Sequence, residues 1–297
     1  MRREKKEKKP ALILRVIRHY GVNPGRVVSE ILEWVEVLVV AGLLAFLVIS
    51  FVTVRMHVPT DSMYPTINGD SSALRADSFF VDKVSYYFRN PKPGDIVVFW
   101  HTEAVLINRV AAGSKAERAG ITTGDRLITI NRGPIFSTAE AEEIIASLPV
   151  GSQIVLGVLG RPLFELGEKT PQTTSLVELG ITTREQRIRY VKRLVAVGGQ
   201  TVQIEGGDIM VDAKKLQGKR FDRYYYSNLP GLLYGVEPTL VPEGKWFVLG
   251  DNSKDSFDSR YWGFVDERDF IGEPYIRVWP LSRFGPMNGY FSFGRGE

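Results

Sequence analysis

At 297 residues, of which 44% are hydrophobic, the chain is long enough for one large or two modest globular cores. Its formal net charge of +4 is concentrated in the first nine residues, where six basic residues outnumber two acidic ones. The nearly neutral remainder lacks the clustered basic surface that nucleic-acid binding requires, so no nucleic-acid partner is expected. The absence of cysteine excludes disulfides and a thiol nucleophile, and with three histidines and no H-E-x-x-H motif, no metal or other cofactor is expected.

Residues 37–54, VLVVAGLLAFLVISFVTV, form an apolar run without a charge, of a length that suits a membrane-spanning helix. A buried core helix is the alternative, but the run has no polar stripe, which favours lipid on all sides. The run is long and does not end in the small residues of a cleaved export signal, so it predicts a retained anchor. Basic residues crowd the preceding segment, which predicts a cytoplasmic tail over residues 1–36 and an exported remainder.

The exported part is predicted to be mainly β and antiparallel. Short β-rich runs separated by glycine and proline turns occur in residues 55–104 and again in residues 181–297, for example IVVFW, IRYVKRLVAV, TVQI and KWFVLGD. These two ranges are expected to form the two parts of one catalytic domain.

Residues 105–180, between those ranges, have a different character and are expected to form an inserted α+β domain. One helix is clear, with Ser137 as its N-cap, Glu140 as the capping-box partner, and Ala141, Ile144, Ile145 and Leu148 at helical spacing. The stretch GSKAERAGITTGDRLITIN resembles a PDZ domain of the kind associated with bacterial proteases. That resemblance implies a peptide or protein ligand held by strand addition, and a spacer or lid that packs on the enzyme is the alternative.

Two residues stand out on their own chemistry. Ser62 lies in PTDSMYPT, just beyond the apolar run, where a serine between prolines is ordinarily a turn former. Lys192 lies in the middle of the predicted strand RYVKRLVAV, on the same face as Tyr190 and Leu194. Such a lysine usually extends its ammonium to water, but burial would lower its pKa and allow it to accept a proton from a serine.

A third stretch, GDNSKDSFDSRYWGFV at residues 250–265, is dense in polar residues and continues directly into aromatic ones. A solvated loop is one interpretation, and a hydrogen-bonded loop held against the core is the other. Together, PTDSMYPT, GDIVVFW, YVKRLVAVGGQTV and this stretch resemble the type I signal peptidases, membrane-bound serine proteases that remove export signals. The order of these boxes and their spacing from the apolar run agree with that family.

The resemblance implies a role for each matching residue. Ser62 is the implied nucleophile, Lys192 the general base, and Ser256 the residue that orients the base by hydrogen bonding. Thr60 would supply a hydroxyl to the oxyanion hole, and Asp258 and Arg260 an ion pair that supports the loop. Asp61 departs from the family, where glycine is common, and introduces a negative charge beside the nucleophile.

The resemblance also implies pockets for small side chains at the first and third positions before the cut. Six bulky residues occupy the matching positions, and ordinary core packing is the alternative for some of them: Met56, Val58, Met63, Ile67, Tyr190 and Val191. The expected substrates are therefore signal peptides of exported preproteins, cleaved after small-x-small motifs.

The sequence thus predicts a single-pass protein of the bacterial inner membrane, with its catalytic domain on the periplasmic side and the lipid bilayer and signal peptides as partners. A trypsin-like Ser-His protease is disfavoured, because His101 and Ser62 occur in the wrong order and no GNSGG-like elbow is present. A membrane-tethered PDZ adaptor with an inactive β domain is the alternative from another class, and it would leave Lys192 and residues 250–265 without a purpose.

Overall fold

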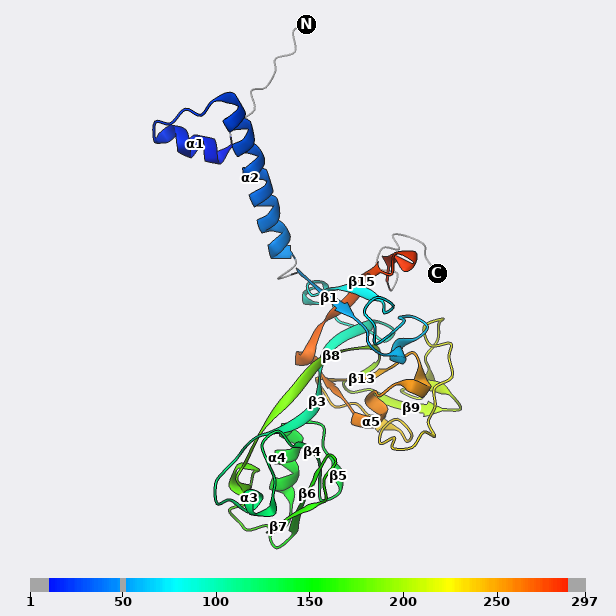
Figure 1. Ribbon diagram of the computed structural model, residues 1–297. Helices are drawn as coiled ribbons and strands as arrows, with labels where there is room; N and C mark the ends of the chain where they lie inside the picture. The colour runs from blue at the N-terminus through cyan, green and yellow to red at the C-terminus, as the bar shows by residue number, and fades with distance from the viewer. Residues whose placement is uncertain (1–10, 49–51, 288–297) are drawn as a thin grey trace.

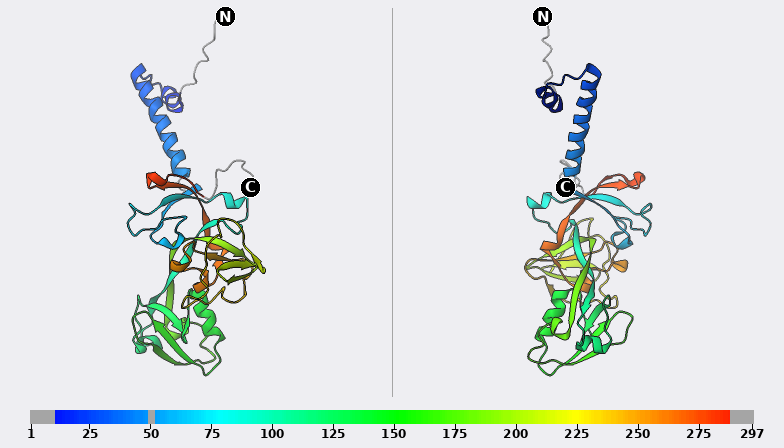
Figure 2. Two further views of the ribbon diagram at one scale, coloured as in Figure 1. Left: turned by 90° about the vertical axis from the view of Figure 1, so that its right-hand side faces the viewer. Right: turned by 60° about the vertical axis from the view of Figure 1, so that its left-hand side comes forward.

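A computed structural model describes residues 11–48 and 52–287 (Figure 1). Two helices, α1 (Leu12–His19) and α2 (Arg26–Leu47), precede a body built of β-strands, and a second β-rich unit lies at the end of the molecule opposite α2 (Figure 2). Of the expected basic tail over residues 1–36, residues 1–10 lie outside the described part, and the remainder includes α1 and the first part of α2.

The bounds predicted for the apolar segment need correction. The helix begins at Arg26, well before residue 37, and β1 begins at Thr53, inside the predicted run. Pairing of β1 with the next strand prevents the helix from continuing to residue 54, and residues 49–51 lie outside the described part. Among the described residues, no helix combines the length and hydropathy needed to cross a bilayer.

The body confirms a mainly antiparallel β architecture. Every strand ladder in the described chain is antiparallel, and the strands form one sheet of twelve strands and a smaller sheet of four. The strands of the body are β1 (Thr53–His57), β2 (Ser78–Asp82), β3 (Ile96–Val110), β8 (Ile181–Val197), β9 (Thr201–Glu205), β10 (Asp208–Val211), β11 (Lys214–Lys215), β12 (Thr239–Leu240), β13 (Lys245–Leu249), β14 (Val265–Asp266), β15 (Phe270–Trp279) and β16 (Gly285–Pro286).

Short helices connect these strands: η2 (Asp61–Met63), η3 (Ser85–Tyr87), η5 (Ser253–Asp255), α5 (Ser259–Trp262), η6 (Glu267–Asp269) and η7 (Leu281–Arg283). Three groups of buried apolar side chains form the core of the body. One lies beneath β1 and β2, a second under the four-stranded sheet, and a third around Phe99, Trp246 and Trp262.

The longest strands, β3 and β8, connect the body to the second unit. They pair with each other from Ile96 opposite Arg193 to Val110 opposite Ile181, so the ladder runs from one unit into the other, with register shifts between Thr102 and Ala104 and between Ile107 and Arg109. Figure 1 shows these two strands as the only ribbons that cross between the two units. Near its C-terminal end β8 also pairs with β13, which makes that part of β8 an interior strand.

The second unit, which we call the insert, has a core of its own. Its elements are α3 (Lys115–Ala119), β4 (Arg126–Ile130), β5 (Gly133–Pro134), α4 (Thr138–Ser147), β6 (Gln153–Val158), β7 (Phe164–Glu168) and η4 (Val177–Leu179), and its core residues extend from Val105 to Ile181. As predicted, α4 has Ser137 as its N-cap, and the hydroxyl of Ser137 accepts from the Glu140 N–H at 3.0 Å. The Glu140 carboxylate accepts from the N–H of Phe136, one residue earlier than a standard capping box predicts.

The carbonyls at the C-terminal end of α4 are satisfied by a lysine that directly follows β7. The buried Lys169 ammonium donates to the carbonyls of Ile145, Ala146 and Leu148. A cation at this end of a helix meets the negative pole of the helix dipole as well as unpaired carbonyls.

Candidate active site

Ser62 lies in the short helix η2, which begins four residues after the end of β1 at His57. The side chain is 5% exposed. The Ser62 carbonyl accepts from the N–H of Asn252 at 3.0 Å, and the Asn252 amide donates to the carbonyl of Asp61 at 3.2 Å. The segment around Ser62 is therefore attached through its main chain to the loop at residues 250–258, which is far away in sequence.

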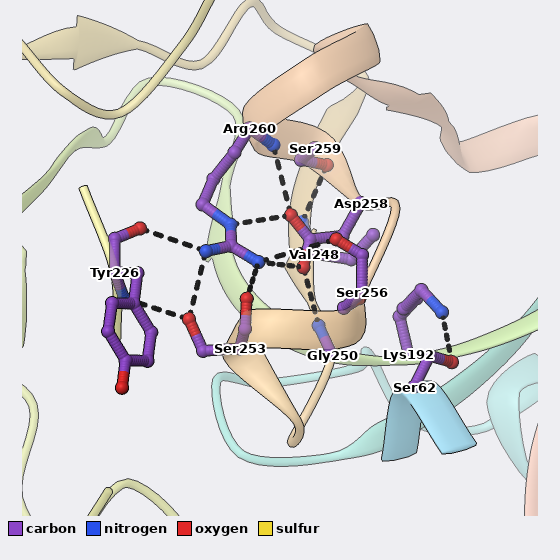
Figure 3. A network of polar contacts seen from close by, with 10 residues as sticks. All are labelled: Ser62, Lys192, Tyr226, Val248, Gly250, Ser253, Ser256, Asp258, Ser259 and Arg260. Carbon is purple, nitrogen blue, oxygen red and sulfur yellow. Dashed lines mark hydrogen bonds and ion pairs between the residues drawn. The ribbon is translucent and has the colours of Figure 1, made fainter. Parts of the chain in front are cut away.

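Lys192 lies in β8, opposite Val97 of β3, and its side chain is only 4% exposed. Its Nζ donates a hydrogen bond to Ser62 Oγ at 2.6 Å (Figure 3). The same atom lies 5.2 Å from the centre of the Tyr190 ring. Burial lowers the pKa of the Lys192 ammonium to about 8, against the opposing effect of the carboxylates of Asp258 and Asp251. Near this pH the amine is neutral in a large fraction of molecules and is able to accept the hydroxyl proton of Ser62.

Thr60 and Asp61, which precede Ser62, point in different directions. Thr60 Oγ1 donates to Ser62 Oγ at the long distance of 3.4 Å, so its hydroxyl lies beside the reactive oxygen. The carboxylate of Asp61 accepts from the N–H of Gly69 at 3.0 Å. Gly69 is required there, because a Cβ at that position would lie 1.8 Å from the carbonyl oxygen of Thr60. Asp61 therefore stabilises the turn around Ser62 by binding Gly69.

Ser256 lies in the loop at residues 250–258 and is buried, but the expected hydrogen bond to Lys192 is absent. Within the described chain, its hydroxyl has no hydrogen-bond partner, and the Lys192 amine donates to Ser62 instead. A Cβ at Gly250 would lie 2.1 Å from Ser256 Oγ and 2.5 Å from the Ser62 carbonyl oxygen. Only glycine therefore lets the Ser256 hydroxyl and the Ser62 main chain approach the same point of the loop.

Asp258 and Arg260 form an ion pair that is completely buried. The guanidinium donates to both carboxylate oxygens of Asp258, at 2.8 and 2.9 Å, and also to the carbonyls of Tyr226 and Ser253 (Figure 3). The Asp258 carboxylate accepts in addition from the N–H of Gly250 at 3.0 Å. This network ties the two ends of the 250–258 loop together beneath Lys192.

A second buried ion pair lies beside the first and was not identified from the sequence. Arg193, the residue after Lys192, binds Asp251 through two nitrogens at 2.7 and 2.6 Å. Asp251 also pairs with Arg223 and accepts from Thr66, a residue of the PTDSMYPT box. The Arg-Asp pair thus links the strand of Lys192, the loop at 250–258 and the segment that follows Ser62. An arginine next to Lys192 on a mostly apolar strand was the signal that could have indicated a buried ion pair. Its partner Asp251 is 58 residues away, so the sequence alone did not identify the pair.

A cavity of about 270 Å³ opens beside the two reactive groups, and we call it the Ser62 cavity. Its lining comprises Met56, Val58, Pro59, Thr60, Ser62, Glu103, Ile188, Arg189, Tyr190, Val191, Lys192, Asp255 and Phe257. Four of the six residues expected in substrate pockets are among them: Met56, Val58, Tyr190 and Val191.

The expected pocket positions of Met63 and Ile67 need correction. Both side chains are 0% exposed and belong to the core beneath β1 and β2, because η2 turns this side of the chain inward. Glu103 and Phe257 line the Ser62 cavity although sequence reasoning did not select them. His101 is also close to Lys192 and stacks on Tyr190, with ring centres 4.5 Å apart, and burial lowers its pKa to about 4. In the described part of the chain, no three His, Cys, Asp or Glu side chains are grouped so that they could hold a metal ion.

Comparison with known proteins identifies similar sequences across most of the chain. The family model for signal peptidase, peptidase S26, matches residues 31–279. The chain is 24% identical over 259 residues to a signal peptidase I of Leptolyngbya laminosa, with 87% of this chain and 85% of that protein covered. It is 28% identical over 261 residues to a probable signal peptidase I-1 of Synechocystis, with 88% of each covered. A solved signal peptidase I from Enterococcus faecalis is 30% identical over 30% of this chain and 84% of its own, with a TM-score of 0.24.

The buried Asp258–Arg260 pair leads to a prediction about stability. Arg260→Met should lower the free energy of unfolding by about 3–5 kcal/mol, because it leaves the Asp258 carboxylate buried without a cation. Urea unfolding of the full chain in detergent, followed by tryptophan fluorescence, measures this loss. Arg268→Met is a matched control, since Arg268 also binds the aspartate two residues before it but is exposed to solvent. Equal effects of the two substitutions would contradict a special role for burial.

Proposed function

The chain belongs to the signal peptidase family, peptidase S26, and is a serine endopeptidase; on this basis we propose that Ser62 is its nucleophile and Lys192 its general base. In the proposed reaction, the enzyme removes signal peptides from exported preproteins after small-x-small motifs. The observation that carries the proposal is the 2.6 Å contact between Lys192 Nζ and Ser62 Oγ, made by an amine that is almost completely buried.

The proposed chemistry begins with the neutral form of Lys192. The amine accepts the proton of the Ser62 hydroxyl while Oγ attacks the carbonyl carbon of the scissile bond. The resulting ammonium then protonates the leaving amine of the mature protein, which breaks the C–N bond and leaves an acyl-enzyme. In the second half, the neutral amine removes a proton from water while the oxygen of that water attacks the acyl carbon. The ammonium then returns this proton to Ser62 Oγ as the ester bond breaks, which releases the signal peptide and restores both the hydroxyl and the neutral amine.

Two neighbouring residues support this chemistry. The Thr60 hydroxyl lies beside Ser62 Oγ, where, together with the Ser62 N–H, it would stabilise the negative oxygen of the tetrahedral intermediate. The hydroxyl of Ser256 is buried and unpaired within the described chain. An unpaired buried hydroxyl costs free energy, so a bond to the Lys192 amine when that amine is neutral would be favourable and would orient it.

The small-x-small preference is supported by the walls of the Ser62 cavity. Met56 and Val58 of the β1 segment and Tyr190 and Val191 of β8 all line it, and such bulky walls leave room only for small substrate side chains. Both segments offer extended backbone to a substrate peptide. Burial of an apolar wall against alanine contributes little, so the selection operates mainly by excluding larger side chains.

The localisation is also part of the proposal. We place the protein in the bacterial inner membrane, anchored by the apolar run that includes the C-terminal half of α2, with the β body on the periplasmic side. The large apolar side chains of α2 are exposed along the helix, for example Leu38, Val39 and Phe46, and no residue of α2 is buried. Exposed apolar surface of this extent is expected to bind lipid or protein.

The insert is proposed to be a PDZ-like domain. Support comes from the resemblance of GSKAERAGITTGDRLITIN, from its separate core, and from the capped helix α4. Between Ile181 and Ile188, the described ladders pair β8 with β3 alone, so one edge of β8 is available for a ligand strand. The membrane-tethered adaptor with an inactive body is not favoured, because it gives no reason to bury Lys192 against Ser62.

Ser62→Ala and Lys192→Arg test the proposed dyad directly. Each should reduce cleavage of a peptide with an Ala-x-Ala cut by about 10³-fold or more, since one lacks the nucleophile and the other carries a guanidinium that keeps its proton. Ser71→Ala and Lys254→Arg are matched controls outside the Ser62 cavity and should retain activity. Substantial turnover by Ser62→Ala, with unchanged folding, would show that another group attacks the peptide.

The lowered pKa of Lys192 predicts the acid limb of the pH profile. Because the neutral amine is the active form, kcat/KM should rise about tenfold per pH unit and level off above pH about 8. Steady-state hydrolysis of the same peptide provides the measurement. It should extend from about pH 5 to about pH 10, a range that covers both a lowered and an ordinary lysine pKa. A limb at the ordinary lysine pKa would contradict the proposed desolvation.

Thr60 is expected to act through its hydroxyl. Thr60→Val keeps the shape of the side chain but removes the donor, and should reduce kcat by about 10²–10³-fold. Thr60→Ser keeps the donor and should retain most of the activity. If both variants lost activity equally, Thr60 would be needed for its methyl group and not for the oxyanion.

A further inference from the structure

A second cavity, of about 160 Å³, lies where the insert meets the body, and we call it the insert cavity. The body contributes residues 101–105 of β3 together with Phe257, and the insert contributes residues 126–128 and 134–136 from the hairpin β4–β5. Most of these side chains are apolar. A dry apolar cavity of about 150 Å³ is large enough to hold benzene, so this one has room for one bulky apolar side chain.

The insert cavity lies next to the Ser62 cavity. Glu103 and Phe257 line both, so the two spaces share a wall. Phe257 comes from the loop that carries Ser256 and Asp258, and its side chain is 48% exposed. Glu103 lies where the β3–β8 ladder shifts register between Thr102 and Ala104. A bulge of this kind bends its strand and redirects a side chain, and bulges are frequent beside active sites.

The wall contributed by the insert is held firmly in place. Phe136 packs against the core of the body around Phe99 and Trp262. Thr138 donates its N–H to the carboxylate of Glu185 on β8 at 2.8 Å, and the carbonyl of Glu103 accepts from the guanidinium of Arg126. The hairpin β4–β5 and the start of α4 are therefore fixed to β3 and to β8, the strand that carries Lys192.

From this geometry we propose that the insert completes the substrate cleft, and that the insert cavity binds a bulky apolar side chain of the preprotein at about the fourth to sixth residue from the cleaved bond. The proposal rests on the proposed function, because it assumes that a peptide is cut at Ser62. It adds a specificity element that the body alone does not contain.

The distance along β8 from Lys192 to the insert cavity determines which substrate residue reaches that cavity. The Ser62 cavity is lined by residues 188–192 of β8, so an extended peptide in it runs beside that strand. The insert cavity begins at His101, which pairs with Ile188, four residues from Lys192. At about 3.3 Å per residue, four residues of extended substrate reach this point, and the next two pass the hairpin.

A peptide scan on the wild-type full chain in detergent tests the proposal. The parent peptide has an Ala-x-Ala cut and serine at the fourth, fifth and sixth residues on both sides, and each serine is replaced singly by leucine. Leucine at one or two adjacent positions on one side should raise kcat/KM about 10-fold, the usual discrimination of an apolar pocket. Equal rates for all the leucine peptides and the parent would overturn the proposal while leaving the proposed function intact.

Variants then assign the preference to the insert. Ile128→Glu introduces a charge into the insert cavity at a half-buried position, and should reduce the ratio of leucine to serine rates to about 1. Val150→Glu is the matched control, because Val150 belongs to the insert but is 64% exposed and lines neither cavity. This control should keep both the ratio and the basal rate.

The remaining outcomes are also decisive. A preference that survives in Ile128→Glu, or that is lost equally in Val150→Glu, would overturn the proposal. If Ile128→Glu does not fold, the wild-type scan still decides, and Ile128→Ala repeats the test with a smaller change. Failure of the wild-type chain to cleave any of the peptides, or equal cleavage by Ser62→Ala, would overturn the proposed function itself and this inference with it.

Discussion

The structure depends on one amine being kept out of water next to a hydroxyl. Lys192 lies on β8 opposite Val97 of β3 and directly before Arg193, which pairs with both β3 and β13, and its side chain is only 4% exposed. Asp258 and Asp251 oppose the effect of burial by favouring the charged ammonium. Each of them is bound by a buried arginine, Arg260 and Arg193 respectively. The two ion pairs therefore stabilise the loop and also limit the negative potential at the amine, so that burial determines its pKa.

Close backbone contacts bring the hydroxyl to that amine. The segment around Ser62 meets the loop at residues 250–258 through the bond from the Asn252 N–H to the Ser62 carbonyl. Gly69 and Gly250 lie at the two points where a side chain would collide with the main chain of this segment. Main-chain bonds and glycines place Ser62 more rigidly than side-chain contacts alone, and a hydroxyl held within hydrogen-bond distance of its base avoids the entropy cost of finding it.

Local patterns in the sequence predicted the parts of the site that local physics determines. Alternation in RYVKRLVAV placed Lys192 on the same strand face as Tyr190 and Leu194 but left its burial open, and the residues around Ser137 predicted the start of α4. The bounds of the apolar helix were wrong, because pairing of β1 in the sheet ends the helix early. Two further features were missed because they join residues that are distant in sequence. The partner of Arg193 is 58 residues away, and the bulge at Glu103 depends on the register of β3 and β8. Hydrophobicity also could not separate Met63 and Ile67, which face the core, from Met56 and Val58, which face the cavity.

The way in which the insert is attached bears on what it does. The insert is not joined by a flexible linker but grows out of β3 and β8, which pair with each other from Ile96 opposite Arg193 to Val110 opposite Ile181. Any change in the position of the insert must bend that ladder or break the contact of Phe136 with the body. Both changes would act on the strand that carries Lys192, since β8 has no break between Ile181 and Val197. The position of the insert and the position of Lys192 therefore depend on one structural element, the strand β8.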